Sequence, residues 1–325
     1  MHLCKIIAPK RRFFSMKKCY FLLFLFISIF LYFSCRKTEI TPAYLSVSIE
    51  DLQNCINVEN FNDVHGTNYD KEQRDVIKQQ NFKDILVSIN GTELGYWQLP
   101  CKIPLLPNYS GTNNVRITPC VRIVNSISLT TVQYTFVAPV EQTFNMEREG
   151  EYKLSNLKFE YVKGVSFPVL ETFAQSTIFQ SNDTIDGARM EISYNEELNK
   201  YVGKIALDND SLKYFNVVTP YFPLKGHLVK HFLEMYYKCE GGEMTVSLNF
   251  QNTYSGAPPQ DLAVLPSSKS WKKIYVDISE IIDLASGAAE QVSVRLYIQG
   301  NRNSNSKNAY FYFGNVKLIS MPDLY

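Results

Sequence analysis

Apolar and polar residues alternate with a period of two along much of the chain after residue 42, and no other feature constrains the fold more. In residues 43–50, for example, Leu45, Val47 and Ile49 alternate with polar residues. Because successive side chains of a strand point to opposite faces, such a run predicts a strand with one buried face. The pattern predicts further strands at 84–89, 102–106, 115–123, 127–136, 142–147, 204–207, 233–238, 244–250, 271–278, 292–298 and 309–319.

An all-β chain of two sandwich domains accounts for these strands. The 325 residues suffice for two domains with separate cores, and 21 Tyr and 21 Phe favour strands. We expect a first β domain at 43–161, with a polar excursion at 51–80, and a second at 173–325. Residues 162–172 form an extended connector between them, and only 279–289 have a helical pattern.

The start of the chain carries the features of an export signal. Lys17 and Lys18 precede an apolar run of 14 residues, from Tyr20 to Phe33, which is interrupted only by Ser28. A helix needs about 20 apolar residues to span a bilayer, so this run is too short for a membrane anchor and fits the core of a signal peptide.

The end of this segment, Tyr32-Phe33-Ser34-Cys35, resembles the lipobox of bacterial lipoproteins. The resemblance implies that residues 1–34 are a signal peptide that begins in fact at Met16, that cleavage precedes Cys35, and that Cys35 carries acyl chains such as palmitate. Residues 35–42 are then a lipidated tether. Arg36 resembles the residue found after the cysteine in lipoproteins sorted to the outer membrane. Both the periplasmic and the surface face of that membrane remain open.

Charge argues against nucleic acid as a partner. Six of the 33 basic residues and none of the 32 acidic residues precede Cys35, so the processed chain has a formal net charge of −5, from 27 basic and 32 acidic residues. Proteins that bind the phosphate backbone need a basic surface, which this composition does not supply.

Two stretches resemble β domains of Bacteroidota-type cell-envelope lipoproteins. In the first half, Ile85–Gly91, Leu94-Gly95 and Leu99-Pro100 are similar to PEGA-type or immunoglobulin-like repeats. In the second half, three segments resemble the jelly roll of carbohydrate-binding modules: Leu170–Phe173, Ser270–Ile278 and Tyr312–Leu318. The resemblance implies a glycan-binding role.

The same resemblance bears on metal binding. The closing strand of such modules commonly carries Asp near a structural calcium, but Gly314 stands at that place here. We therefore expect no metal, with Glu171 and Asn315 as weak calcium candidates.

Motifs of catalysis are absent from the sequence, which favours a protein that is not an enzyme and has no cofactor. Neither His-Glu-x-x-His nor Gly-x-Ser-x-Gly nor a Gly-rich phosphate loop occurs. His227 and His231 are four residues apart, and in a strand that spacing separates them by about 13 Å, too far for a shared metal.

Cysteine spacing suggests one disulfide. Cys101 and Cys120 are equidistant from a turn centred on Ser110-Gly111, so a simple hairpin would place them opposite each other. An oxidising envelope compartment permits this bond. Two buried free thiols are the alternative.

Exposed aromatic residues are the candidate glycan contacts, because sugar rings stack on flat side chains. Trp97 is flanked by predicted loops, and Tyr310 and Tyr312 share one face of the last predicted strand. Trp271 we assign to the core. Thr184 and Ser211 lie in Asp-Thr-Ile and Asp-Ser-Leu triplets, which resemble the O-glycosylation acceptors of exported Bacteroidota proteins.

Three functions remain open. The leading hypothesis is a membrane-anchored envelope lipoprotein that binds a glycan or a protein partner without catalysis. The second is a structural or accessory subunit of an outer-membrane protein assembly. The third is a glycan hydrolase that uses scattered acids such as Glu149, Glu151 and Glu171.

Overall fold

β-strands make up most of the chain in the computed structural model, and the predicted all-β sandwich fold class is confirmed. The structure describes residues 42–52, 55–106, 109–124, 129–182, 188–208, 211–226, 229–251, 258–287 and 289–322. By the contacts between Cα atoms, the chain divides into two units, Met1–Pro42 and the compact unit Ala43–Tyr325. The signal peptide and Cys35 lie outside the described residues.

The first half of the compact unit contains ten strands and three short helices among its described residues. The strands are β1 (Ala43–Val47), β2 (Ile56–Asn57), β3 (Asp84–Ile89), β4 (Thr92–Gln98), β5 (Cys101–Leu105), β6 (Gly111–Val124), β7 (Leu129–Gln133), β8 (Val140–Met146), β9 (Glu151–Lys153) and β10 (Phe159–Glu160). The helices are the 3-10 helix η1 (Glu50–Leu52), α2 (Phe61–His65) and α3 (Lys71–Lys78).

The second half is also built mainly from strands. They are β11 (Ser166–Glu171), β12 (Gln180–Ser181), β13 (Glu191–Asn195), β14 (Lys200–Leu207), β15 (Tyr214–Val218), β16 (Phe222–Lys225), β17 (Val229–Glu240), β18 (Gly242–Phe250), β19 (Gln260–Leu265), β20 (Ser268–Asp277), β21 (Gln291–Arg302) and β22 (Ala309–Pro322). One helix, α4 (Ser279–Ser286), follows β20, within the segment predicted to be helical.

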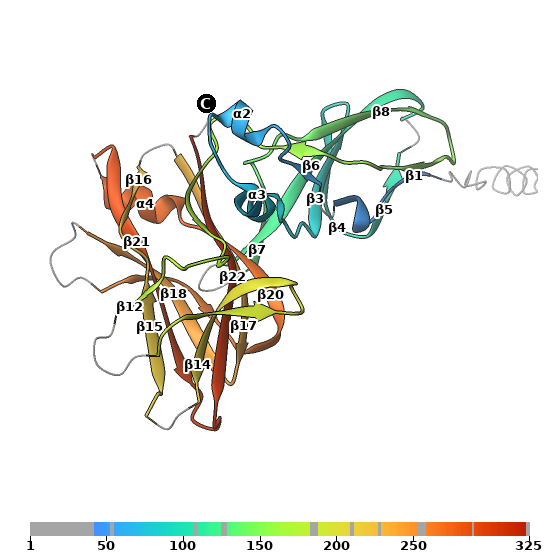
Figure 1. The fold of residues 1–325 in the computed structure, drawn as a ribbon. Helices are drawn as coiled ribbons and strands as arrows, with labels where there is room; N and C mark the ends of the chain where they lie inside the picture. Colours follow the sequence, from blue (N-terminus) through green and yellow to red (C-terminus); the bar gives the residue numbers. More distant parts are fainter. Residues whose placement is uncertain are drawn as a thin grey trace, which may run out of the picture. The chain divides into compact units, whose positions relative to one another are not determined.

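One large sheet runs through both halves. Its strands follow the order β13-β14-β22-β17-β20-β6-β3-β4, with β11 paired to β22 and both β7 and β8 paired to β6. Figure 1 shows β14, β22, β17 and β20 of this sheet. β20 and β6 are parallel and join at a single register pair, Tyr275 with Ile123. A second sheet, β12-β15-β21-β18-β19 with β16 on β21, supplies the other layer of the sandwich.

Two hydrophobic clusters form the core. The first lies in the second half, where Leu233, Met235 and Tyr237 of β17 face the strands of the second sheet. The second cluster gathers the first half but also takes in Phe232, Tyr275, Ile319 and Met321 from the second half. One face of β17, β20 and β22 therefore packs in the first cluster, and part of the opposite face packs in the second.

A bulge in β22 changes which side chains reach that opposite face. The register between β17 and β22 shifts between Glu234 and Tyr236, and Asn315 takes a positive φ of 48° at this place. Because a bulge inserts one extra residue, the alternation of side chains restarts after it. Phe313 and Val316 both lie in the first cluster, and Lys317 lies beside Glu234 on the opposite face.

Two predicted segments differ from the structure. The polar excursion at 51–80, where the sequence showed no helical pattern, contains α2 and α3. The connector at 162–172 is extended as predicted, but it contains β11, which pairs antiparallel with β22.

The predicted Cys101–Cys120 disulfide is wrong. Both cysteines are free thiols, and their strands do not pair. Cys101 lies on β5 opposite Val47 of β1, whereas Cys120 lies on β6 opposite Asp84 of β3. The hairpin assumed for residues 101–120 does not form, because each strand finds a partner from another part of the chain.

Candidate functional site

We call the face of β17, β20 and β22 that points away from the first cluster the outer face. Charged and aromatic side chains gather on it. At one end it is covered by the last turn of α3 and by aromatic residues of the first half, including Tyr134 and Tyr161. At the other end it presents partly exposed aromatic and charged side chains. A cavity opens between α3 and the β13–β14 hairpin, next to β22.

Buried charges lie under the covered end. Glu234 is fully buried, and its Oε2 lies 3.0 Å from Lys273 Nζ and 3.2 Å from Lys317 Nζ. The Tyr134 hydroxyl donates to Oε1 of the same carboxylate. Gln80, just after α3, accepts from Lys273 at 2.8 Å and donates to the Tyr134 hydroxyl at 2.9 Å. We call Glu234, Lys273 and Lys317 the buried charge cluster.

One carboxylate faces two amines in this cluster, and the pKa values follow from that imbalance. Burial alone would raise the pKa of Glu234, but the two lysines and the Tyr134 hydroxyl outweigh it and lower that pKa. Burial lowers the pKa of Lys273 to about 7. Burial is the largest single effect on Lys317 and lowers its pKa, but the charges and hydrogen bonds of Glu234 and Tyr161 together outweigh it, so that the pKa of Lys317 is raised. The cluster is therefore closed and structural, since both lysines pair with Glu234, and Tyr134 and Gln80 supply further partners.

The cavity beside α3 has a volume of about 340 Å³ and is open to solvent at tyrosine side chains. Tyr194 on β13 and Tyr201 on β14 form a cross-strand pair and are 52% and 48% exposed. Their rings meet edge to face, with centroids 5.5 Å apart. Two large apolar rings exposed together at the mouth of a cavity provide a surface for stacking a ligand.

The tight hairpin between β13 and β14 positions these tyrosines. The side chain of Asn195 accepts from the backbone N–H of Leu198 at 3.0 Å, and Asn199 takes a positive φ of 50°. The Tyr194 hydroxyl donates to Asn199 Oδ1 at 2.5 Å, which fixes the ring against the turn. Asn tolerates such a φ better than other non-glycine residues, so the turn is encoded locally.

Polar groups line the inner wall of the cavity. Gln79 Oε1 accepts from Asn315 Nδ2 at 2.5 Å and from Lys200 Nζ at 3.3 Å. Asn315 Oδ1 is buried and has no hydrogen-bond partner among the described residues. Burial lowers the pKa of Lys200 to about 8. An unsatisfied buried acceptor beside an amine donor favours a ligand that offers hydroxyl groups.

Helix α3 forms the opposite wall. A capping box begins it, since Gln73 N donates to Asp70 Oδ1 at 2.8 Å and Asp70 N donates to Gln73 Oε1 at 3.0 Å. Glu72 and Asp75 are exposed on this wall, and they bring negative charge to the rim of the cavity.

The structure does not bring the three predicted glycan contacts together. Tyr310 and Tyr312 share one face of β22, as predicted. This is the outer face at its uncovered end, where Lys204 and Lys238 lie over their rings at 5.5 and 5.8 Å. Trp97 lies on β4, at the other end of the sheet order, and packs against the second cluster.

Trp271 is not a core residue, contrary to our assignment. It is partly buried on the outer face, where its ring meets that of Tyr312 edge to face at 6.2 Å. Trp271 shares its side of β20 with Lys273 and Tyr275, because residues two apart in a strand point the same way.

Glu171, one of the two calcium candidates, has other partners. Glu171 is buried, and its two carboxylate oxygens accept from the backbone N–H groups of Phe173 and Ile178, both at 2.7 Å, and from the Thr177 hydroxyl at 3.0 Å. It therefore holds the loop after β11. No group of three or more metal-ligating side chains occurs in the part of the chain that the structure describes.

The acids of the hydrolase hypothesis do not converge. Glu151 on β9 pairs with Lys102 at 2.5 Å and is exposed, whereas Glu171 is buried in its loop. Both ring nitrogens of His231 already have hydrogen-bond partners. Nδ1 lies 2.7 Å from Ser320 Oγ, and Nε2 lies 2.7 Å from the Lys225 carbonyl.

Of the predicted modification sites, only Ser211 is described, and it is exposed. Thr184, like Cys35, lies outside the described residues. No helix of the described residues is long and apolar enough to cross a membrane.

Sequence reasoning missed the cavity residues Gln79, Tyr194, Asn199, Lys200 and Tyr201. A signal was present for the hairpin, because two tyrosines flank a polar turn with Asn at both ends. Nothing in the sequence indicates that Gln79 meets Asn315, which is 236 residues away.

Comparison with known proteins gave structural similarities only. No family profile and no curated protein sequence matches the chain. Among solved structures, a carbohydrate-binding module described as belonging to the β-sandwich superfamily is similar, with a TM-score of 0.34 and 10% identity over 73% of this chain and 85% of that one. A Clostridium thermocellum xylanase 10B structure, a CBM22-1 and GH10 protein complexed with xylohexaose, has a TM-score of 0.34 and 13% identity over 47% of this chain. The match spans 28% of the xylanase chain.

An adhesin domain is also similar. The K3 domain of Lys-gingipain from Porphyromonas gingivalis W83 has a TM-score of 0.33 and 10% identity, over 48% of this chain and 99% of that domain. At these TM-scores no ligand or activity is transferred from these proteins to the present chain.

Proposed function

We propose that this chain is a glycan-binding lipoprotein of the cell envelope, and that the cavity between α3 and the β13–β14 hairpin is its glycan site. The observation that supports this most is the combination of two exposed tyrosine rings with a buried acceptor, Asn315 Oδ1, that lacks a partner.

The two parts of the site match the two surfaces of a sugar. The axial C–H groups of a pyranose carry partial positive charge, and the face of an aromatic ring is negative, so the ring of Tyr201 or Tyr194 stacks on the sugar. Hydroxyl groups at the sugar's edge then donate to Asn315 Oδ1 and accept from Lys200 Nζ. Asn315 and Lys200 both belong to the lining of the cavity, so we propose that the sugar edge faces them.

Charge at the rim restricts the kind of glycan. Glu72 and Asp75 are both exposed at the cavity, and Lys200 is the single lysine in its lining. Carboxylates of uronic acids would meet two like charges there, which disfavours them. Neutral sugars and amino sugars are therefore the preferred class.

We further propose that a lipid on Cys35 tethers the chain to the membrane. The sequence of the export segment supports this part of the proposal. Several acyl chains make a stable anchor, because each buried CH₂ contributes about 0.8 kcal/mol. A glycan-binding domain fixed to the outer membrane would hold polysaccharide at the cell envelope. Binding without catalysis is consistent with the lining of this cavity, which contains none of the three acids of the hydrolase hypothesis, Glu149, Glu151 and Glu171.

A panel of oligosaccharides tests the glycan site. Residues 43–325 are titrated with xylohexaose, mannohexaose, chitohexaose and hexagalacturonate, with binding followed by calorimetry. We expect at least one neutral or N-acetylated hexaose to bind more tightly than hexagalacturonate. Binding of hexagalacturonate alone would contradict the assigned specificity, and the absence of any binding would contradict the glycan function for these sugar classes.

A further inference from the structure

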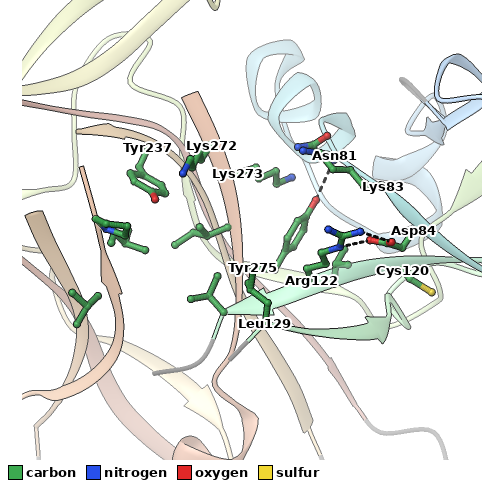
Figure 2. A pocket seen from close by; sticks show the side chains of 16 residues that line it. Asn81, Lys83, Asp84, Cys120, Arg122, Leu129, Tyr237, Lys272, Lys273 and Tyr275 are labelled. Carbon is green, nitrogen blue, oxygen red and sulfur yellow. Dashed lines mark hydrogen bonds and ion pairs between the residues drawn. The ribbon is translucent and has the colours of Figure 1, made fainter. Parts of the chain in front are cut away.

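A second cavity, separate from the glycan site, lies where β20 meets β6. Its volume is about 360 Å³, and strands from both halves of the chain line it. Figure 2 shows Lys83, Lys272 and Lys273 along one side of this cavity and Leu129 on the other. The glycan site does not use any of these residues.

The floor and one wall of this cavity are apolar. Val121 of β6, Leu265 of β19 and Ile274 of β20 are buried in its lining. At the mouth, Leu129 is 67% exposed and Val264 is 55% exposed. Large aliphatic side chains this exposed next to a concave apolar surface indicate a place where an apolar group is bound.

The other side of the cavity is cationic. Lys83 and Lys272 are exposed, and neither forms an ion pair with an acid among the described residues. Asp84 is the single acid of the lining, and Arg122 neutralises it through two hydrogen bonds of 2.7 Å. Lys273 is already held by Glu234. Two unpaired ammonium groups therefore set the charge at this edge.

We propose that this cavity binds an amphiphilic anion, namely a single alkyl chain that ends in a carboxylate. The chain lies against Leu129, Val264 and Ile274, and the carboxylate lies between Lys83 and Lys272. A hydroxyl-rich sugar does not suit this cavity, because its hydroxyl groups would lose water against aliphatic side chains without gaining partners. A cationic amphiphile would meet the lysines as like charges.

The affinity of this cavity for a ligand should depend on the length of the alkyl chain and on the charge of the head group. Each CH₂ buried in the cavity strengthens binding about fourfold. Decanoate is therefore expected to bind about 15-fold more tightly than octanoate. Acetate has no chain to bury, and decylammonium has the wrong charge, so both should bind far more weakly than decanoate.

Calorimetric titration of residues 43–325 with these four compounds, below their micelle concentrations, tests the proposal. The double variant Lys83→Gln/Lys272→Gln should weaken decanoate binding about tenfold, whereas Lys158→Gln, an exposed lysine outside the cavity, should leave it unchanged. Leu129→Ser should also weaken it. All four side chains are exposed, so these variants should keep the melting temperature of the wild type.

Three results would overturn the proposal: no saturable binding of decanoate, equal binding of decanoate and decylammonium, or unchanged decanoate affinity in the double lysine variant. Oligosaccharide binding in the same preparations reports on the glycan site alone, because none of the substituted residues lines that cavity. Failure of one site is thus distinguishable from failure of the other.

Discussion

Glu234 is the residue whose environment differs most from that of an ordinary strand residue. It is fully buried between two lysines, on the side of β17 that faces away from the first cluster. Removing one member of a buried ion pair is strongly destabilising, because it leaves an uncompensated charge without water. The alternating pattern of β17 predicts that this side chain shares a face with Phe232 and Tyr236, but it does not show that the face is covered.

Glu234→Gln should lower the free energy of unfolding by about 3–5 kcal/mol near neutral pH. In the variant both lysines lack a counterion, so folding must bury two positive charges or release their protons. Burial already lowers the pKa of Lys273 to about 7, while the unfolded lysine keeps a pKa near 10.5. Stability therefore rises with pH across that interval, because the unfolded state binds more protons.

Urea unfolding at about pH 7 and about pH 10 measures both effects, and the loss caused by Glu234→Gln should be smaller at the higher pH. Glu240→Gln is the matched control on the same strand. Glu240 is 39% exposed and pairs with Lys238, so its loss should be about 1 kcal/mol or less. Equal losses in the two variants, or a loss for Glu234→Gln that grows with pH, would contradict the role of the cluster.

Parity explains one error at the residue scale. Trp271 is an odd-numbered residue, as are Lys273 and Tyr275, whereas the core residues Ile274 and Val276 of the same strand are even-numbered. The register of β20 with β17 is regular from Lys272 to Asp277, and extending its parity by one residue places Trp271 on the outer face, where its ring meets that of Tyr312. Parity could not place Lys317 in the same way. The bulge at Asn315 decides on which face of β22 its side chain lies, and alternation alone does not reveal that bulge.

At the scale of elements, helix α3 connects the sites of this protein. Its residues Glu72 and Asp75 line the cavity that we propose as the glycan site. The Ile77 carbonyl accepts from Tyr161 at 2.8 Å, and the Gln79 carbonyl accepts from Lys273 at 2.8 Å. An eight-residue helix is marginal by itself, so its cap and its tertiary contacts must hold it.

Asp70→Ala should destabilise the protein by about 1 kcal/mol, because it removes the N-terminal cap of α3. The measurement is the midpoint of urea unfolding. Asp63→Ala, at an exposed acid in the first turn of α2 with no side-chain cap, serves as the control. A loss for Asp70→Ala no larger than that for Asp63→Ala would show that tertiary contacts alone determine α3.

Long strands were predictable from the sequence, and short or polar elements were not. β17, β18, β20, β21 and β22 alternate over most of their length, so each overlaps a predicted strand, although the bulge at Asn315 interrupts the alternation of β22. Helix α3 was missed because its apolar contacts come from only two adjacent residues, Val76 and Ile77, although Asp70 and Gln73 carry the capping signal.

Strand partners were the least predictable property. The cysteine prediction assumed that neighbouring strands form a hairpin, but β5 pairs with β1 and β6 pairs with β3 and β8. The local sequence specifies that a segment is a strand, and long-range packing decides which strand lies beside it. The proposed glycan site also depends on long-range packing, since its cavity lies between α3 and a hairpin more than 100 residues away.

At the scale of the whole molecule, the two sandwich halves share one sheet, and the first half covers the buried charge cluster of the second. Residues of the second half contribute to the second hydrophobic cluster, and Gln80 of the first half completes the polar network around Glu234. The boundary at 162–172 stays a prediction, as does the anchoring of the chain through Cys35.

Intact mass spectrometry of membrane-extracted protein tests the anchor. The mature chain should begin at Cys35 and carry the mass of a diacylglycerol, with or without a further acyl chain on its amine. Cys35→Ala should leave an uncut precursor in the inner membrane, because the peptidase acts after the thiol is alkylated. Cys19→Ser, in the same leader, should be processed normally. A mature chain that begins elsewhere, or lacks lipid, would contradict this localisation.

The central claim is that the tyrosines at the mouth of the cavity bind a glycan. The most direct test is a calorimetric titration of wild type, Tyr201→Ala and Tyr96→Ala with whichever oligosaccharide of the panel binds best. Tyr201 and Tyr96 are similarly exposed, at 48% and 52%, but Tyr96 lies on β4 away from the cavity. Tyr201→Ala should weaken binding about tenfold through the lost stacking, while Tyr96→Ala should bind as the wild type does. Unchanged affinity in Tyr201→Ala, or an equal loss in both variants, would contradict the account.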